Sequence, residues 1–332
     1  YERANSQEGN GVAEKRKDIL STRNTLPAIT DINLPKINLG KVNNHGYELS
    51  LGWNDRAGKV DYWLKANVSY AKNKIIYMDE VVTNEPYMAE TGRSTGLTYG
   101  YIFDRFLQKD DFDADGNLKK DENGRQILPQ MALGTPRPGD ALFKDLNGDG
   151  VINGDDKTRF GYAERPDYVF GFLGGLKWKN FEFSMQWTAV MNASRILDGE
   201  YRNAFGSTNS RMLLKFLADG RWTEENPNPH AAYPRIYSAS SVHTTYNRNF
   251  SDYHLFDSDY FRFKTLSLGY TVPSATVKNW GLQSLKVYVT GENLFTVRAD
   301  KKMEDFDPET PSGRGTDTRG TSSISLGVNL TF

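Results

Sequence analysis

Residues 168–187 read YVFGFLGGLKWKNFEFSMQW, two alternating segments that are separated by only two residues. In the first segment every second position is apolar or glycine, from Tyr168 to Trp178. The apolar positions of the second segment are Phe181, Phe183, Met185 and Trp187. An apolar period of two predicts strands with one apolar face, and the Lys179–Asn180 connector predicts a hairpin between them.

The same alternation recurs along the chain and predicts about eight strands in an all-β protein. It is present at residues 47–53, 62–70, 285–289 and 323–332, and more weakly at residues 12–20. In FRFKTLSLGY, residues 261–270, the apolar positions change parity after Phe263. A β-bulge near Lys264 and Thr265 would return them to a single face.

Aromatic residues bracket the apolar face of three of these strands. The pairs are Tyr47 and Trp53, Tyr62 and Tyr70, and Tyr168 and Trp178. Transmembrane β-barrels carry aromatic girdles at both interfaces around an apolar band of about 25 Å, with small or polar residues toward the lumen. A soluble β-sandwich with an aromatic core is the alternative that the alternation alone leaves open.

Connector lengths favour the membrane reading. Short connectors at Asp55–Lys59, Lys179–Asn180 and Pro273–Ser284 alternate with long ones at about 72–167, 188–259 and 298–321. Barrels of the outer membrane have short periplasmic turns and long extracellular loops. We therefore expect the long connectors outside the cell and the C-terminus in the periplasm.

An open sheet cannot stand in lipid, because its edges leave backbone groups without hydrogen-bond partners. The loops are also too long for a minimal eight-stranded barrel. The sequence thus predicts that residues 1–332 are the C-terminal part of a larger antiparallel transmembrane β-barrel, in which residues 73–166 form one long extracellular loop.

Composition excludes several other classes of protein. Lys and Arg number 41 against 42 Asp and Glu, so the chain lacks the basic excess that nucleic-acid binding requires. The absence of cysteine excludes disulfides, zinc–thiolate sites and a cysteine nucleophile. No apolar run reaches the ~18 residues that a transmembrane helix needs.

One stretch matches the spacing of an EF-hand calcium loop: DLNGDGVINGDD, residues 145–156. The predicted ligands are Asp145, Asn147, Asp149, the Val151 carbonyl, Asn153 through water, and Asp156. Pro and Gly residues on both sides predict no flanking helices, so the expected Ca²⁺ would be structural and would stiffen a surface loop. The alternative is an Asx- and Gly-rich turn that forms without metal.

A second, looser match is DFDADGNLKKDE, residues 111–122. Its candidate ligands are Asp111, Asp113, Asp115, Asn117 and Glu122. Lys119 occupies the position of a water-mediated ligand and adds an unfavourable positive charge. A metal-free turn is therefore the stronger interpretation here.

The remaining residues give no catalytic constellation, and we expect no enzyme activity and no organic cofactor. Histidines lack metal-ligand spacing, and GRSTG at residues 92–96 lacks the strand–turn–helix context of a nucleophile elbow. Four loop aromatics are candidates for stacking on a sugar, although packing within a loop is the commoner role: Tyr201, Phe205, Trp222 and Tyr237.

Several segments in order resemble the SusC/RagA-like TonB-linked outer-membrane proteins. They are KDILSTRN, INLGKVNNHGYELSLGW, KDLNGDGVINGDDKTRFG, RWTEENPNPHAAYPRIY, DYFRFKTLSLGYTVP, LKVYVTGENLFTV and SLGVNLTF. The resemblance covers nearly the whole chain. The family's N-terminal extension, TonB box and plug domain have no match in it.

The resemblance implies the C-terminal third or so of a 22-stranded TonB-dependent transporter in the outer membrane of a Gram-negative bacterium. Such transporters import glycan oligomers or peptides under a SusD-like surface lipoprotein, which acts as a lid. The implied partners are that lipoprotein, the rest of the barrel and its plug, the TonB complex and membrane lipids. Leu330 and Phe332, on an alternating last strand, resemble the signal that the barrel-insertion machinery reads.

A secreted, soluble, all-β calcium-binding module, either a glycan binder or part of a hydrolase, is the alternative function. Such a module has no need of alternating connector lengths, aromatic brackets or the terminal Phe332. These three features favour the importer.

Overall fold

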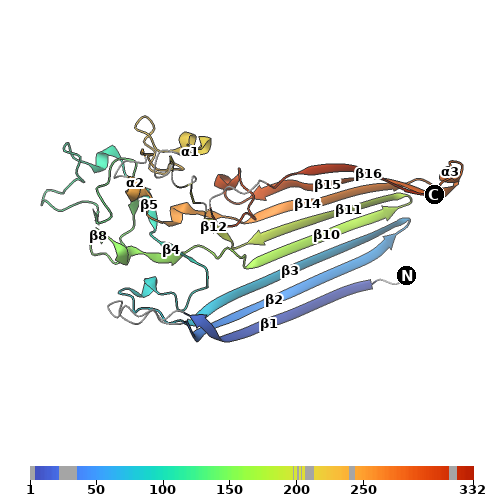
Figure 1. Cartoon of the computed structure of the whole chain (residues 1–332), viewed down its shortest axis with the longest axis horizontal. Coiled ribbons are helices and arrows are strands. Elements are labelled where there is room, and N and C mark those ends of the chain that lie inside the picture. The colour runs from blue at the N-terminus through green and yellow to red at the C-terminus, as the bar shows by residue number, and fades with distance from the viewer. Residues whose placement is uncertain are drawn as a thin grey trace.

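The computed structural model describes residues 4–21, 36–196, 198–199, 202, 204–205, 213–238, 244–313 and 320–332. Its main feature is an eight-stranded antiparallel sheet in the order β1-β2-β3-β10-β11-β14-β15-β16 (Figure 1). The strands are β1 (Ala4–Ser21), β2 (Ile37–Ala57), β3 (Val60–Tyr77), β10 (Tyr168–Trp178), β11 (Phe181–Met191), β14 (Tyr260–Thr271), β15 (Ser284–Arg298) and β16 (Ser323–Thr331). Each strand predicted from the alternation lies within one of these eight, except that the last prediction extends one residue beyond β16, to Phe332.

The predicted bulge is also confirmed. Gln186 pairs with Thr265 and Trp187 pairs with Phe263, so Lys264 is the extra residue. The same irregularity separates Phe263 and Thr265 in the pairing of β14 with β15. One extra residue resets the side-chain parity, because successive side chains point to opposite faces of a strand.

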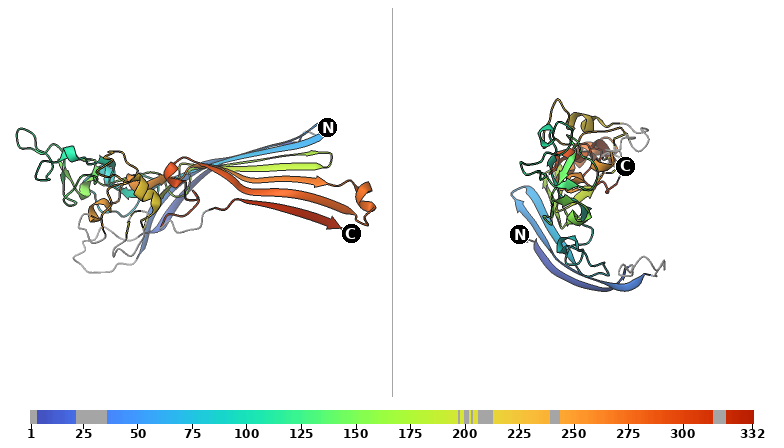
Figure 2. Two further views of the ribbon diagram at one scale, coloured as in Figure 1. Left: turned by 90° about the horizontal axis from the view of Figure 1, so that it is seen from above. Right: turned by 90° about the vertical axis from the view of Figure 1, so that its left-hand side faces the viewer.

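Strand pairing collects the apolar positions on one face of the sheet. Leu49, Val68, Phe170, Ala189 and Phe261 are successive cross-strand partners on this apolar face. The neighbouring row on the opposite, polar face contains Ser50, Asn67, Gly171, Thr188 and Arg262. The whole sheet therefore has one apolar and one polar face, and it curves when viewed end-on (Figure 2).

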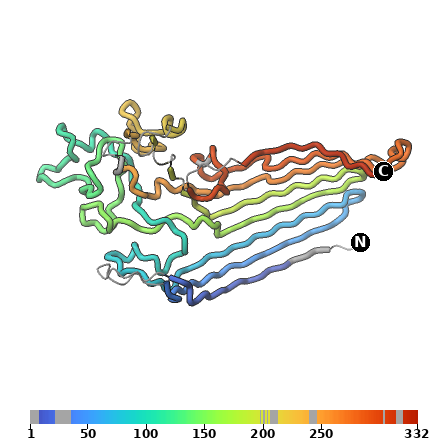
Figure 3. Tube along the Cα trace, in the orientation of Figure 1, coloured from blue at the N-terminus to red at the C-terminus, as the bar shows by residue number. Residues whose placement is uncertain are grey.

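Connectors of different length lie at the two ends of the sheet. Two residues join β2 to β3 and β10 to β11, and a segment with helix α3 (Ser274–Lys278) joins β14 to β15. The long connectors lie together at the other end, away from both chain termini (Figures 1 and 3). In the sheet, β1 and β16 have one neighbouring strand each.

The long connectors contain the remaining secondary structure. Their short strands pair as β4 (Thr98–Gly100) with β9 (Thr158–Phe160), β5 (Phe103–Phe106) with β7 (Ala141–Phe143), β6 (Gln130–Met131) with β8 (Val151–Ile152), and β12 (Ser194–Ile196) with β13 (Leu255–Asp257). Helices α1 (Lys215–Gly220) and α2 (Thr244–Asn247) belong to the second long connector. The 3₁₀ turns are η2 (Pro86–Met88), η3 (Lys109–Asp111), η4 (Gly154–Asp156), η5 (Asp252–His254) and η6 (Lys301–Met303).

No helix within the described part of the chain is long and apolar enough to cross a membrane.

Candidate functional site: the loop body

The described residues of the three long connectors, within 78–167, 192–259 and 299–322, pack together and are called the loop body here. The first and second connectors share one hydrophobic core. Trp222 and Tyr246 of the second connector are buried among residues of the first, which include Tyr101, Phe106 and Phe143. The two connectors therefore fold as one unit rather than as separate loops.

Trp222 occupies its place because Gly139 has no side chain. A Cβ atom at Gly139 would clash with the Trp222 ring, and the φ of Gly139 is +89°, which favours glycine. The Trp222 side chain is 1% exposed, so its ring leaves no face open for a sugar. Of the predicted stacking residues, Trp222 thus serves the packing role.

The other loop aromatics lie in different environments. Tyr237 is half-buried and donates a hydrogen bond to the carboxylate of Asp140 at 2.9 Å. Burial, and then the charge of Asp140, raise the pKa of the Tyr237 hydroxyl. Phe205 is half-buried with a φ of +64°. Tyr201 lies outside the described residues.

Asp140 itself joins the two connectors. Its fully buried carboxylate also accepts hydrogen bonds from the Arg137 backbone N–H and the Asn247 side-chain amide, both at 2.8 Å. Sequence reasoning missed this residue, because its partners on the second connector are about one hundred positions away in the chain. A buried carboxylate that accepts several hydrogen bonds fixes the positions of the donor residues, because the loss of any bond would leave a buried charge poorly compensated.

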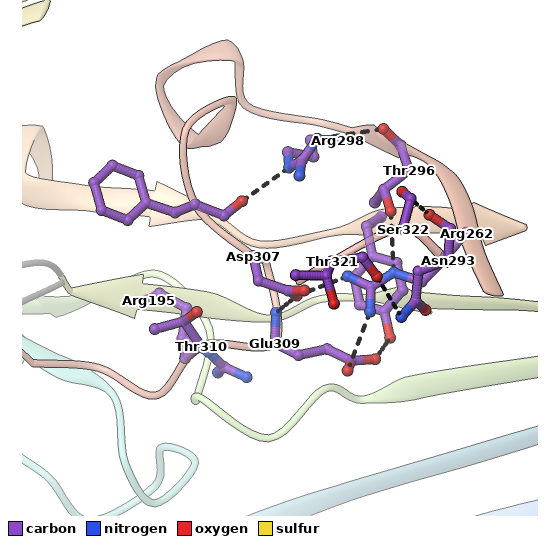
Figure 4. A network of polar contacts seen from close by, with 12 residues as sticks. Arg195, Arg262, Asn293, Thr296, Arg298, Asp307, Glu309, Thr310, Thr321 and Ser322 are labelled. Carbon is purple, nitrogen blue, oxygen red and sulfur yellow. Dashed lines mark hydrogen bonds and ion pairs between the residues drawn. The ribbon is translucent and has the colours of Figure 1, made fainter. Parts of the chain in front are cut away.

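The third connector is fastened to the polar face of the sheet by Arg262 of β14 (Figure 4). The Arg262 guanidinium lies 2.6 Å from Asp307 and 3.3 Å from Glu309, and its Nε donates to the Thr296 hydroxyl at 3.0 Å. The Tyr260 hydroxyl donates to Glu309. Arg262 is 4% exposed, so the guanidinium at the centre of this cluster, called the arginine clamp here, is shielded from bulk solvent, whereas the Glu309 side chain remains half exposed.

Further contacts join the third connector to the other two. Arg195 of β12 donates to the Thr310 carbonyl at 3.0 Å, and the Gly313 N–H donates to the Ile196 carbonyl at 2.9 Å. The Ser312 N–H donates to the carboxylate of Glu164, on the first connector, at 3.2 Å. All three long connectors are therefore linked where they leave the sheet.

In the calcium-like stretch, carboxylates fold the loop by accepting backbone hydrogen bonds. Asp145 accepts from the N–H groups of Gly148 at 2.7 Å and Gly150 at 2.8 Å. These glycines have φ values of +76° and +82°, which the tight turn requires. Within the turn, Asn147 accepts from the Asp149 N–H, and Asp149 accepts from the Val151 N–H.

Asp156 closes the same loop from a fully buried position. Its carboxylate accepts from the N–H groups of Leu146 and Asn153, both at 2.8 Å. The Asn153 side chain caps the following 3₁₀ turn by accepting from the Asp155 N–H. Burial raises the pKa of the Tyr87 hydroxyl to about 12, with a further contribution from the negative charges of nearby carboxylates. These carboxylates are those of Glu85, Asp156, Asp155 and Asp145.

The fit of this loop to a cation is incomplete. Across the described residues, no three His, Asp or Glu side chains converge closely enough to hold a metal ion. The carboxylates of Asp145 and Asp156 are instead directed at backbone N–H groups. Calcium at residues 145–156 therefore stays a prediction from the sequence.

In the second match, Asp111 is engaged by a guanidinium. Its two oxygens accept from Arg105 at 2.7 and 2.8 Å, and the Gln108 N–H adds a bond at 2.7 Å. Burial alone would raise the pKa of Asp111, but the bonds from Arg105 and Gln108 outweigh it and lower that pKa. Asp113 accepts from the N–H groups of Asp115 and Asn117, as in a metal-free turn. The remaining candidate, Glu122, is exposed.

The C-terminal pair lies at the end of the sheet with the short connectors. Leu330 pairs with Leu285 of β15, and Phe332 follows the last strand with 79% of its surface exposed. Their role in assembly stays a prediction.

No family model matches the chain. The chain is similar to two proteins of Formosa agariphila, the TonB-dependent receptors P3 and P26, with 25% identity over 325 residues and 28% over 317 residues. These alignments cover 94% and 92% of this chain but 29% of either relative. The TonB-dependent receptor SusC of Bacteroides thetaiotaomicron is 24% identical over 320 residues, which are 91% of this chain and 28% of SusC.

The fold is similar to that of a solved structure, the RagAB peptide transporter. The TM-score is 0.70 at 18% identity, over 99% of this chain and 33% of that chain. The chain thus spans about a third or less of the proteins that it matches. In sequence the chain is similar to part of several TonB-dependent receptors, SusC among them, and in fold it is similar to a third of a chain of the RagAB peptide transporter.

Proposed function

We propose that the chain forms part of an outer-membrane importer that takes up glycan oligomers or peptides at the expense of energy supplied through TonB. In this proposal the loop body faces the outside of the cell and the C-terminus faces the periplasm. The similar proteins named above are receptors and a transporter, which supports transport rather than catalysis.

The observation that carries the proposal is the separation of the two faces of the sheet. Phe261, Trp178 and Phe181 on the apolar face are 46%, 44% and 42% exposed. A water-soluble protein would bury such a face, because each large apolar side chain gains about 1.5–3 kcal/mol on leaving water. Lipid removes the need for burial, and a polar face then suits a hydrated lumen.

The polar face offers hydrogen-bonding groups to a substrate beneath the loop body. Lys65, Asn67, Gln186 and Thr188 lie in two adjacent rows of this face. Amide, hydroxyl and ammonium groups can bind sugar hydroxyls or peptide groups alike. These groups therefore support both substrate classes, and neither is preferred.

We also propose that a SusD-like lipoprotein covers the loop body, and that the plug and the remaining strands complete the barrel. The unpaired edges of β1 and β16 support the second part, because exposed backbone groups in lipid are costly. The linked connectors support the first part, since a rigid surface favours docking of a lid.

Uptake by whole cells tests this function. A strain that lacks the receptor is complemented with full-length wild type, with Asn67→Trp on the polar face, or with Val68→Trp on the adjacent apolar position. Labelled oligosaccharides and oligopeptides are supplied separately. We expect wild type and Val68→Trp to import one class and Asn67→Trp to import less of it, because a bulky side chain narrows the lumen.

Equal accumulation of both labels with and without the receptor would contradict import. Equal loss in both tryptophan variants would contradict the assignment of the faces. Surface immunostaining of the receptor in each strain shows whether a variant reached the membrane.

A further inference from the structure

On the apolar face, three tyrosines form a row at the end of the sheet nearest the loop body. Tyr47, Tyr70 and Tyr168 are cross-strand neighbours on β2, β3 and β10. Their ring centroids are 5.3 Å apart between Tyr47 and Tyr70, and 4.6 Å apart between Tyr70 and Tyr168. Tyrosines in such a row are typical of the boundary between hydrocarbon and headgroups.

The next two rows toward the loop body contain three lysines and a histidine. The first row is Ala13, His45 and Lys72, and the second is Lys15, Asn43 and Lys74. Neither row contains a carboxylate. Lys72 lies 3.5 Å from Asp167, whereas Lys15, His45 and Lys74 form no ion pair within the described part of the chain. The rows therefore carry positive charge on Lys15 and Lys74 that no carboxylate of the described residues neutralises, while Lys72 shares its charge with Asp167.

On the other side of the tyrosine row, the apolar face contains a groove of about 340 Å³. It forms where Ala66 and Ala189 stand between larger neighbours, which include Val68, Phe170 and Trp187. The short alanine side chains leave an open groove that aromatic rings flank. A groove lined in this way suits one hydrocarbon chain.

The opposite end of the apolar face lacks such a cluster. The row that contains Tyr62 and Leu176 ends in Asp55 of β2, which is a carboxylate. The lysine rows are therefore a property of the loop end and not of both ends of the sheet.

We propose that this surface binds one phosphorylated lipid of the outer leaflet, with an acyl chain in the groove and the phosphate on Lys15, Lys72 and Lys74. The proposal rests on the proposed function, since it requires the apolar face to stand in lipid. The order of groove, tyrosines and lysines matches the order of chain, interface and headgroup in such a lipid. Charge complementarity selects the occupant, because clustered lysines attract anionic headgroups and have no such preference for zwitterionic ones.

The test uses the full-length receptor, purified, delipidated and studied by native mass spectrometry. The probes are phosphatidic acid, phosphatidylcholine and diacylglycerol with identical chains, and inorganic phosphate as a competitor. The variants are Lys72→Gln with Lys74→Gln, the groove-filling Ala189→Trp, and the matched control Lys65→Gln, which lies on the polar face of the same strand.

We expect wild type and Lys65→Gln to retain one phosphatidic acid in preference to either other lipid. The double lysine variant should bind it about tenfold more weakly, because each lysine near an anionic headgroup contributes to affinity. Ala189→Trp should weaken all three lipids. Inorganic phosphate should compete only weakly, since it lacks the chain.

Equal retention of phosphatidylcholine would overturn the proposal, and so would unchanged binding in the double lysine variant. A receptor dimer that excludes lipid would show that a second copy occupies the surface, which also overturns it. Lipid binding is measured without transport, so its failure is distinct from failure of uptake.

Discussion

In the loop body, Phe106, Leu107 and Ile152 have no exposed surface, whereas Phe261 on the apolar face of the sheet is 46% exposed. The loop body is built like a small water-soluble domain, with aromatic and aliphatic residues inside and its few buried carboxylates, such as Asp140 and Asp156, held by hydrogen bonds. On the sheet, by contrast, large apolar side chains are exposed on one face. The difference shows that one chain is adapted to two solvents, and that the boundary follows the ends of the strands.

Disruption of the hydrophobic core around Trp222 should have the largest effect on stability. Trp222→Ala should destabilise the loop body by about 3–5 kcal/mol, because it leaves a cavity where two connectors meet. Limited proteolysis of the purified receptor should then cut within the long connectors. The control Trp178→Ala removes an exposed tryptophan of the apolar face and should leave proteolysis unchanged; equal cleavage in both would contradict a separate loop core.

The apolar face gives the next effect. Leu49→Arg should cost about 2–4 kcal/mol near the bilayer midplane and less toward the interface, whereas Ser50→Arg, on the polar face, should cost little. Unfolding of the receptor in lipid by guanidinium measures both. A larger cost for the Ser50 variant would reverse the assignment of the faces.

The arginine clamp connects the two regions and should give a smaller effect. Arg262→Met should cost about 2 kcal/mol, because it removes charge-assisted hydrogen bonds and leaves Asp307 without its cation. We expect faster hydrogen exchange in residues 304–313 and no change in the Trp222 core. The control Arg56→Met changes an exposed arginine at the short-connector end. Unaltered protection from hydrogen exchange in residues 304–313 of the Arg262 variant would show that the clamp does not hold the third connector on the sheet.

The calcium-like loop should give the smallest effect. Asp145→Ala with Asp149→Ala should cost about 1 kcal/mol, because backbone N–H groups lose their acceptors. If calcium binds, its millimolar addition should also protect residues 145–156 from protease in wild type and not in the variant. The control Asp113→Ala alters the neighbouring turn. Protection that chelation leaves unchanged would show that the loop folds by its hydrogen bonds alone.

Most strands of the sheet could be predicted from the sequence. Each face of the sheet has one kind of surroundings, so apolar and polar residues alternate along each strand with a period of two. β1 was the weakest prediction, since its Gly9 and Gly11 pair with Leu49 and Tyr47 and so lack apolar side chains on that face. The extensions of β2 and β3 beyond the tyrosine row are longer than the alternation indicates. Residues 37–46 and 71–77 there are rich in polar side chains, which carry no such pattern.

The loop body was predictable only where contacts are local. Asx- and Gly-rich spacing indicated the turns at residues 113–117 and 145–150, because their hydrogen bonds join near neighbours. The arginine clamp joins residues 45 positions apart, and no local pattern marks such a pair. Trp222 was a stacking candidate with loop packing as the commoner role, and a single sequence does not reveal which distant glycine makes room for it.

The place of Trp222 beneath Gly139 has a mechanical consequence. A force on the second connector is transmitted to the first, because the Trp222 ring packs directly against the backbone of Gly139. Displacement is then concentrated where the connectors meet the strands, close to Arg262. The loop body would then move as one rigid unit relative to the sheet, and the arginine clamp would set the force at which that movement begins.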